Sequence, residues 1–329
     1  MEQVIAARMK QVRLGPPAGF HNLSVFPVVG DGPSEPSYFT LDEAMQQHLV
    51  ELGEVSEGGS VPNIRIVNKA SRPILLIDGE ELIGAKQNRI VNLTILVPAQ
   101  QALVIPVSCV EAGRWQSAAG GFVPSSRTHY AKARAEKVRQ VNVSMRADGA
   151  RTADQTEIWA DISAKASRMG GHSATSAMAD LFEQHAAPIE AYVDAILPID
   201  RQVGAVFAID GEVRGLELFD TEPTLRRLLP KLVRSYAIDA IETVRAKTKA
   251  VRVQQVEAFI EAVAAATPER FPAIGLGTDV RFEGPSLTGG ALVTEDAVIH
   301  LAAFHLEEPK SRIFRRSRSR RPDTDDRVF

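Results

Sequence analysis

The 329-residue sequence predicts an α+β protein with a mainly antiparallel β-sheet core, a helical block in the middle of the chain and helices packed on the C-terminal part. Three observations support this class. Short apolar runs follow one another closely in the first third, the apolar period becomes helical from about residue 126, and strands and helices alternate in the last third. Closely spaced strands favour antiparallel pairing, because parallel neighbours need crossovers of a dozen residues or more.

The first third combines strand-like runs with one capped helix. The helix is expected at residues 40–52, and Asp78-Gly79, directly after an apolar run, predicts a tight two-residue hairpin turn. A second turn is expected at residues 98–101. The predicted strands are 23–29, 64–68, 74–77, 89–97 and 102–110.

The middle block has helical periodicity. Val138, Val141 and Met145 share one face of a helix that is basic elsewhere. Thr152 and Gln155 fit a capping box at the start of the next helix, and a third helical region spans 173–196 with an interruption near Pro188.

The last third returns to strands and then alternates. A strand at 205–209 ends in Asp210-Gly211, and an apolar stripe from Leu225 to Val244 predicts a long helix that Pro230 kinks or restarts. A further helix is expected at 253–266. The remaining predicted strands are 278–282, 291–294 and 297–306.

Composition suggests one main domain and a charged tail. We expect an N-terminal segment at 1–19, a single α+β domain at 20–308 and a basic, disordered tail at 309–329. The domain divides into a β-rich part at 20–125, a helical block at 126–198 and an α/β part at 199–308. The tail carries a net charge of +5, so the rest of the chain carries about −8. A net negative charge on the rest of the chain argues against a protein that clamps nucleic acid. Nucleic acid would be contacted only weakly, through Arg312 to Arg321 of the tail.

Several classes of protein are disfavoured by what the sequence lacks. No run approaches the roughly 18 apolar residues of a membrane span, and a single cysteine, Cys109, excludes a disulfide framework and a cysteine-based zinc cluster. We therefore expect a cytoplasmic protein without a membrane or metal partner. Phosphate-binding loops, dinucleotide fingerprints, nucleophile elbows and paired zinc-binding histidines do not occur.

Two polar segments interrupt the apolar strands and form the candidate site. One follows the Asp78-Gly79 turn and the other ends the strand at 102–110. Cations bind a phosphate or carboxylate, and an aromatic ring stacks on a planar group, so the two segments together suit a phosphorylated, nucleotide-like ligand. If the protein is an enzyme, Glu81 or Glu111 would be its acid or base. The ligand-binding candidates are Lys86, Gln87, Asn88, Arg89, Arg114 and Trp115.

A structural interpretation of the same residues stays open. Glu81 and Glu111 can pair with nearby Lys and Arg side chains in a salt-bridge network, which would make the protein a non-catalytic binding or assembly module. The segments at Asp78-Gly79 and Asp210-Gly211 also resemble each other, either as a duplicated β unit or because this turn sequence is common. Only the first segment continues into a polar run.

The quoted segments together resemble a bacterial protein family, the ARG-and-rhodanese-phosphatase-superfamily-associated proteins. The likeness covers roughly residues 20–306 and rests on four motifs: 77–89, 97–98, 109–115 and 154–159. Its members are essentially uncharacterised. The resemblance implies a genomic neighbourhood of ADP-ribosylglycohydrolase and phosphatase-like genes, and brings no catalytic residues. Asp154 stands where the family pattern has a glycine.

Overall fold

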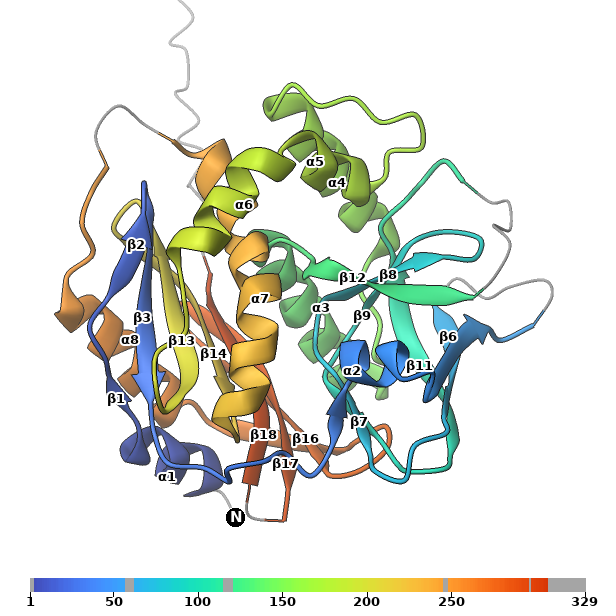
Figure 1. The fold of residues 1–329 in the computed structure, drawn as a ribbon, viewed down its shortest axis with the longest axis horizontal. Coiled ribbons are helices and arrows are strands. Elements are labelled where there is room, and N and C mark those ends of the chain that lie inside the picture. Colours follow the sequence, from blue (N-terminus) through green and yellow to red (C-terminus); the bar gives the residue numbers. More distant parts are fainter. Residues whose placement is uncertain (1–2, 57–61, 115–120, 245–247, 296, 307–329) are drawn as a thin grey trace, which may run out of the picture.

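Two β units with helices between them form the fold, and the predicted α+β class is confirmed (Figure 1). The computed structural model describes residues 3–56, 62–114, 121–244, 248–295 and 297–306. Trp115 and the basic tail at 309–329 lie outside the described residues. The division into a main domain and terminal segments stays a prediction.

The larger unit is a nine-stranded antiparallel sheet in the order β1-β3-β13-β14-β18-β17-β16-β15, with β2 also paired to β3. β3 pairs with β13, although about 170 residues separate them along the chain. The strands are β1 (Arg13–Leu14), β2 (Ala18–Phe20), β3 (Leu23–Val29), β13 (Gln202–Ile209), β14 (Glu212–Phe219), β15 (Pro268–Pro272), β16 (Thr278–Gly284), β17 (Leu287–Thr294) and β18 (Ala297–His305).

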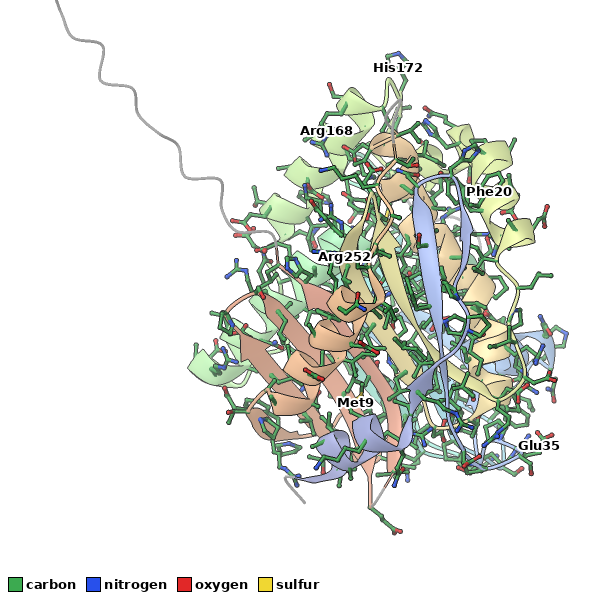
Figure 2. All side chains as sticks on the ribbon, turned by 90° about the vertical axis from the view of Figure 1, so that its left-hand side faces the viewer. Met9, Phe20, Glu35, Arg168, His172 and Arg252 are labelled. Carbon is green, nitrogen blue, oxygen red and sulfur yellow. The ribbon has the colours of Figure 1, made fainter. Side chains whose placement is uncertain are left out.

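Helices cover both faces of this sheet. α1 (Gln3–Gln11) and α8 (Val253–Ala265) pack on one face, where Met9 and Phe259 join the apolar side chains of the strands (Figure 2). α3 (Ala131–Asp148) and α7 (Glu222–Glu242) pack on the other face, between the two β units. Neighbouring residues of each strand point to opposite faces of the sheet, so they pack into two different apolar cores.

The smaller unit is a six-stranded antiparallel sheet in the order β12-β8-β9-β11-β6-β5, and it curls so that its edge strands β12 and β5 contact each other. A Cβ at Gly121 would lie 2.1 Å from the Leu52 carbonyl oxygen, so only glycine permits this approach. A three-stranded sheet, β10-β7-β4, and α2 (Leu41–Gln46) complete the unit. The strands are β4 (Phe39–Thr40), β5 (Val50–Glu54), β6 (Asn63–Asn68), β7 (Ile74–Leu76), β8 (Glu80–Gly84), β9 (Arg89–Val91), β10 (Ile95–Val97), β11 (Ala102–Cys109) and β12 (Phe122–Thr128).

Three predictions about the first third were wrong. The helix expected at 40–52 ends at Gln46, because Val50–Glu54 pairs with β6. The single strand at 89–97 is two strands, β9 and β10, which belong to different sheets. The Asp78-Gly79 turn does not close a hairpin, because β7 and β8 also diverge into different sheets.

The Asp210-Gly211 turn behaves differently. β13 and β14 pair directly across it, and both turn residues have positive φ, 52° and 80°. These values match the two-residue hairpin turn that an Asp-Gly pair favours. At Asp78-Gly79 only Gly79 has a positive φ. The two similar sequences therefore have different structures.

The helical block contains α4 (Gln155–Arg168), α5 (Met178–Gln184) and α6 (Ala186–Ala195). The predicted capping box was wrong, because Asp154 caps α4 by accepting from the backbone N–H groups of Thr156 and Glu157. Gln155 instead exchanges two hydrogen bonds of 2.7 Å with the backbone of Cys109. The long helix α7 runs through Pro230 without interruption.

Candidate functional site

Glu81 lies on β8 with no exposed surface, in an ion pair with Arg127 on β12. The Arg127 Nε donates to its carboxylate at 2.6 Å. Burial raises the pKa of Glu81 even though Arg127 acts to lower it. This carboxylate is thus held inside the protein beside a single guanidinium.

Glu111 anchors a separate cluster at one end of the curled sheet. Its carboxylate accepts hydrogen bonds from Arg114 (Nε 3.0 Å, Nη2 2.7 Å) and from the Asn88 N–H (3.1 Å). Arg114 also donates to the carbonyl oxygen of Ala85 at 2.6 Å. Burial acts to raise the pKa of Glu111, but these hydrogen bonds bring it below its ordinary value. The cluster fastens the turn between β8 and β9.

Arg89 and Gln87 complete this end of the sheet. The Arg89 side chain is fully buried, and its Nη1 donates to the Gln87 carbonyl oxygen and to Gln87 Oε1, each at 3.2 Å. The backbone N–H of Lys86 donates to Glu54 at 3.4 Å. The polar run is therefore built into the protein interior.

The pairing register separates Glu81 from Arg89. Leu82 pairs with Arg89, and Arg89 pairs with Cys109, so these three side chains share one face of the sheet. Glu81 points to the opposite face, because neighbouring residues alternate along a strand. The structure accordingly places Glu81 apart from the Glu111 cluster, and Trp115 lies outside the described residues.

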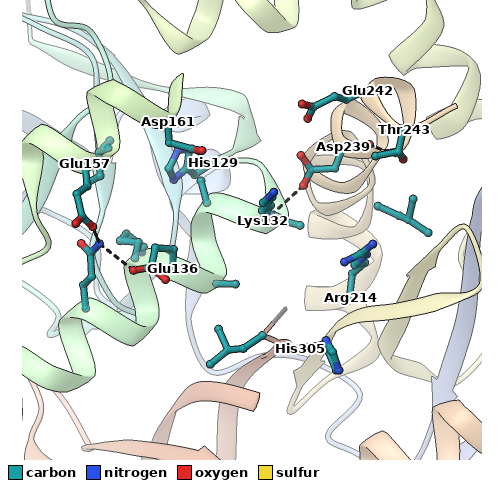
Figure 3. A pocket seen from close by; sticks show the side chains of 18 residues that line it. His129, Lys132, Glu136, Glu157, Asp161, Arg214, Asp239, Glu242, Thr243 and His305 are labelled. Atoms are coloured by element: carbon teal, nitrogen blue, oxygen red, sulfur yellow. Dashed lines mark hydrogen bonds between the residues drawn. The ribbon is translucent and has the colours of Figure 1, made fainter. Parts of the chain in front are cut away.

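A cavity of about 750 Å³ lies elsewhere, between α3, α4, α7 and the ends of β13, β14 and β18 (Figure 3). Its volume falls in the range of about 300 to 1,000 Å³ that is typical of ligand pockets. Carboxylates and cations both line it, together with alanines of α3. The ionisable lining residues are His129, Lys132, Glu136, Lys137, Glu157, Asp161, Arg214, Asp239, Glu242 and His305.

His129 is the unusual residue of this cavity. Its side chain is only 1% exposed, and neither ring nitrogen has a hydrogen-bond partner within the described part of the chain. Burial, Lys137 and Arg134 lower the pKa of His129 to about 3, so the imidazole is neutral at physiological pH. A neutral imidazole offers one donor and one acceptor. Both nitrogens are themselves buried, so the imidazole lies within the wall and its polar atoms do not face the cavity.

The carboxylates of the cavity are held in two ways. On α7, Asp239 accepts from Lys165 Nζ at 2.6 Å and from the Lys132 N–H at 2.9 Å. On α4, Asp161 accepts from the Tyr130 hydroxyl at 2.6 Å, and Glu157 accepts from Gln140 at 2.5 Å. The α7 carboxylate is thus neutralised by a cation, whereas the α4 carboxylates have neutral donors.

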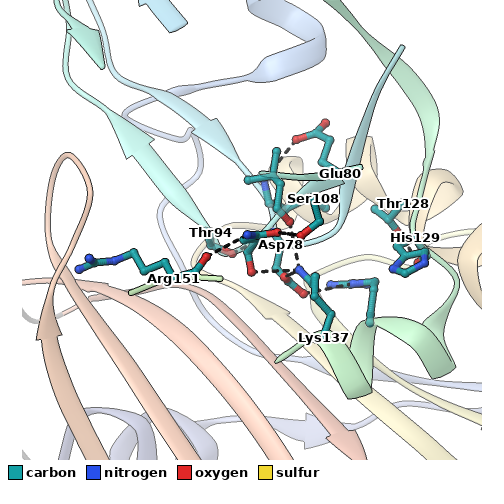
Figure 4. Close-up of polar contacts among 12 residues, drawn as sticks. Asp78, Glu80, Thr94, Ser108, Thr128, His129, Lys137 and Arg151 are labelled. Atoms are coloured by element: carbon teal, nitrogen blue, oxygen red, sulfur yellow. Dashed lines mark hydrogen bonds and ion pairs between the residues drawn. The ribbon is translucent and has the colours of Figure 1, made fainter. Parts of the chain in front are cut away.

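A buried ionic network lies beside the cavity and joins the two β units (Figure 4). Asp78 accepts from Lys137 and from Arg134 Nε, and Arg134 Nη1 donates to Glu217 on β14 at 2.7 Å. The other Glu217 oxygen contacts His300 Nε2 at 3.0 Å. Burial would raise the pKa of Asp78, but Lys137 and Arg134 together lower it. Two of the basic residues of α3 therefore stabilise the interior of the protein.

The sequence did not reveal the cavity residues. His129, Asp161 and Asp239 come from three separate elements, and no motif spacing connects them. The available signal was the set of basic residues on α3, of which Lys137 is buried beside the cavity.

Two further features concern metal ligands and membrane spans. Within the described ranges, no three His, Cys, Asp or Glu side chains gather as ligands for a metal ion. No helix in the same part of the chain is both long and apolar enough to cross a bilayer.

The fold and site together define an α+β protein with a ligand-sized cavity beside a buried ionic network. A family model for the ARG and Rhodanese-Phosphatase-superfamily-associated Protein domain matches residues 11–304. The chain belongs to this family, as the sequence motifs predicted. No curated protein and no solved structure matches the chain significantly.

Proposed function

We propose that this protein binds a phosphorylated or nucleotide-like small molecule, ADP-ribose-related compounds included, in the cavity between α3, α4 and α7. The observation that carries the proposal is the cavity itself, about 750 Å³ in volume, whose lining combines cations, carboxylates and apolar side chains. Its volume and its few polar groups are those of a site for a small molecule.

The lining supports a ligand with distinct polar ends. Lys132, Arg214 and His305 provide positive or ionisable groups for an anion, and Glu157 and Asp161 lie across the cavity from Arg214 and His305 (Figure 3). The alanines of α3 and Ile158 add apolar surface for a ring. A nucleotide combines these three kinds of group.

We also propose that Glu81, Glu111 and the polar run at 86–89 have a structural role. Their hydrogen bonds and ion pairs connect strands and fasten a turn, which supports this role. A structural role for these residues is compatible with ligand binding in the cavity, because none of them lines it.

A thermal-shift screen tests the binding proposal. The panel is ADP-ribose, NAD, AMP, ADP and ribose 5-phosphate, with the full chain. A ligand at a hundred times its Kd stabilises the folded state by about 2.7 kcal/mol, which is readily measured. Absence of a shift with the entire panel contradicts the proposal.

The variant Arg214→Gln tests the charged lining of the cavity. Arg214 lines the cavity and pairs with Glu212 at 2.9 Å, and Gln removes its charge. We expect the free protein to keep its stability and the ligand-induced shift to become smaller. An unchanged shift would show that the anionic part of the ligand binds elsewhere.

A further inference from the structure

α4 forms one wall of the cavity and is held less firmly by apolar packing than the other two helices around it. Three of its 14 residues are buried, compared with nine of 18 in α3 and 13 of 21 in α7. Two of the three, Ile158 and Ile162, are apolar, and the third is Lys165. Helices in proteins owe most of their stability to the packing of an apolar face, so the position of α4 depends more on polar contacts.

The N-terminal end of α4 is fixed to β11 and to α3. Gln155 exchanges its two hydrogen bonds of 2.7 Å with the backbone of Cys109. The Asp154 N–H donates to Gln140 Oε1, also at 2.7 Å. Ile158, close behind on the helix, packs into the apolar core. This end of α4 therefore has the contacts of a pivot.

The C-terminal half of α4 is held instead by charges on α7. Lys165 Nζ donates to Asp239 at 2.6 Å and to Glu242 at 2.5 Å. Arg168 Nε also donates to Glu242, at 2.5 Å. We call these four residues the latch, and they bridge α4 and α7 at the edge of the cavity, because both carboxylates line it. Opening the latch returns its charges to water, and their hydration offsets part of the lost attraction.

Glycines stand in the chain segments before and after α4. Gly149 has φ 76° and Gly170 has φ 69°, and a Cβ at either position would meet no other atom of the described residues within 4 Å. The segments that contain them, 149–154 and 169–176, include neither helix nor strand. Loop residues at the ends of an element absorb the backbone rotation when that element moves. Both connections of α4 are thus suited to a hinge.

From this arrangement we infer that α4 is a lid, which pivots near Gln155 and swings away from α7 when the latch opens, and so admits the ligand to the cavity. The inference rests on the proposed function, because the lid controls entry to the same site. Figure 3 shows α4 and α7 on opposite sides of the cavity. Opening separates the latch and the hydrogen bond from the Tyr130 hydroxyl to Asp161. The contacts that are lost are thus mostly polar, and water replaces them.

Hydrogen exchange of the full chain, followed by mass spectrometry, tests the lid without any ligand. A helix of 14 residues that has left its neighbours is only marginally stable in water, so the amides of an open α4 exchange with solvent. We expect residues 158–168 to be protected at least about tenfold less than the buried amides of α3 and α7. Equal protection in the three helices would overturn the inference.

Variants of the latch provide the second arm. Glu242→Gln removes the charge that Lys165 and Arg168 share, and Arg168→Gln removes the half-exposed cation. We expect each variant to lower the protection of α4 at least about threefold, while α3 and α7 change little. Glu190→Gln is the matched control and should leave α4 unchanged, because Glu190 pairs with Arg234 between α6 and α7 and neither lines the cavity.

An equal loss of protection in α3, α4 and α7, or no loss in α4, would overturn the inference. Absence of binding by the entire thermal-shift panel would contradict the proposed function instead, and the exchange results do not depend on it.

Discussion

Asp78 belongs to a dipeptide typical of turns, yet its side chain is an ionic centre of the protein. Its carboxylate receives Lys137 and Arg134 from α3, and all three side chains are buried. Asp210, in the same dipeptide context, stands in an ordinary hairpin turn. The difference arises from the residues that α3 brings to Asp78, which a local sequence comparison does not contain.

Asp78→Asn should therefore cost far more than Asp210→Asn. Removing one partner of a buried ion pair leaves an uncompensated charge, and we expect a loss of about 3 to 5 kcal/mol in the free energy of unfolding. Asn tolerates the positive φ of position 210 and keeps the shape of the buried Asp210 side chain, so we expect the smaller loss there. Urea denaturation of the two variants measures both values, and similar losses would contradict the ionic role of Asp78.

Asp220 provides a pH-dependent prediction. Burial raises its pKa to about 6, and the Tyr38 hydroxyl donates to it at 2.5 Å. An unfolded aspartate has a pKa of about 3.9, so between these values the folded state holds a proton that the unfolded state has released. The contribution of Asp220 to stability therefore falls as the pH rises from about 4 to 6 and stays unfavourable above that range.

Asp220→Asn removes this dependence. We expect the variant to gain about 2 to 3 kcal/mol relative to the parent protein between pH 4 and pH 7.5, because one pKa unit corresponds to about 1.36 kcal/mol. Asp200→Asn, at an exposed carboxylate, is the control for the change in net charge. A stability difference that does not vary with pH would refute the prediction.

At the level of elements, strands were predicted well where the evidence is local. Apolar runs between turn residues located β3, β6, β7 and β11, because burial on a sheet imposes that pattern directly. Errors occurred where a distant partner decides the outcome. Gln155 pairs with the backbone of Cys109 on β11 and so is not part of a capping box.

The same distinction explains what could be predicted of the site. The sequence singled out the polar run at 86–89 and Glu111, and the contact of Glu111 with Asn88 joins the two segments. These residues are buried and hydrogen-bonded to one another because of the strand register. The composition of the run does not specify that register. The cavity residues range from 129 to 306 along the chain and meet only through the packing of α3, α4 and α7.

Gly149, at the end of α3, and Gly79, before β8, have almost the same φ but different surroundings. Gly149, after α3, has φ 76°, and a Cβ there would meet no other atom of the described residues within 4 Å. A Cβ at Gly79 would instead lie 2.7 Å from Arg134 Cδ and Nε. The environment of the glycine, and not its φ, therefore separates the two positions.

We expect Gly149→Ala to cost about 1 kcal/mol, the conformational penalty alone. Gly79→Ala should cost about 2 kcal/mol more, because it displaces the buried Arg134. Thermal denaturation of the two variants compares them, and equal losses would show that Arg134 moves freely.

At the scale of the whole molecule, one apolar core connects the two β units. Ile77 and Ile90 from the smaller unit belong to the same cluster as Phe207 and Phe304 from the larger sheet, and α3 and α7 contribute the side chains between them. The ionic network from Asp78 to Glu217 crosses the same region. Each unit also has a cluster of its own, and the shared cluster couples the two.

We therefore expect the two β units to unfold in a single cooperative transition. Hydrogen exchange followed by mass spectrometry, at increasing denaturant, reports on β6 and β13 separately. Protection should disappear at the same denaturant concentration for both strands. Two separate midpoints would show that the units are independently stable.

The pairing of β3 with β13 has a consequence for synthesis of the protein. The chain leaves the nine-stranded sheet after β3 and returns to the same place, where the Gly30 N–H donates to the Arg201 carbonyl oxygen at 3.1 Å. At translation rates of about 5 to 20 residues per second, roughly 10 to 35 s pass between the synthesis of β3 and the synthesis of β13. During that interval the newborn chain contains an apolar strand that lacks its neighbour, the kind of segment that chaperones bind.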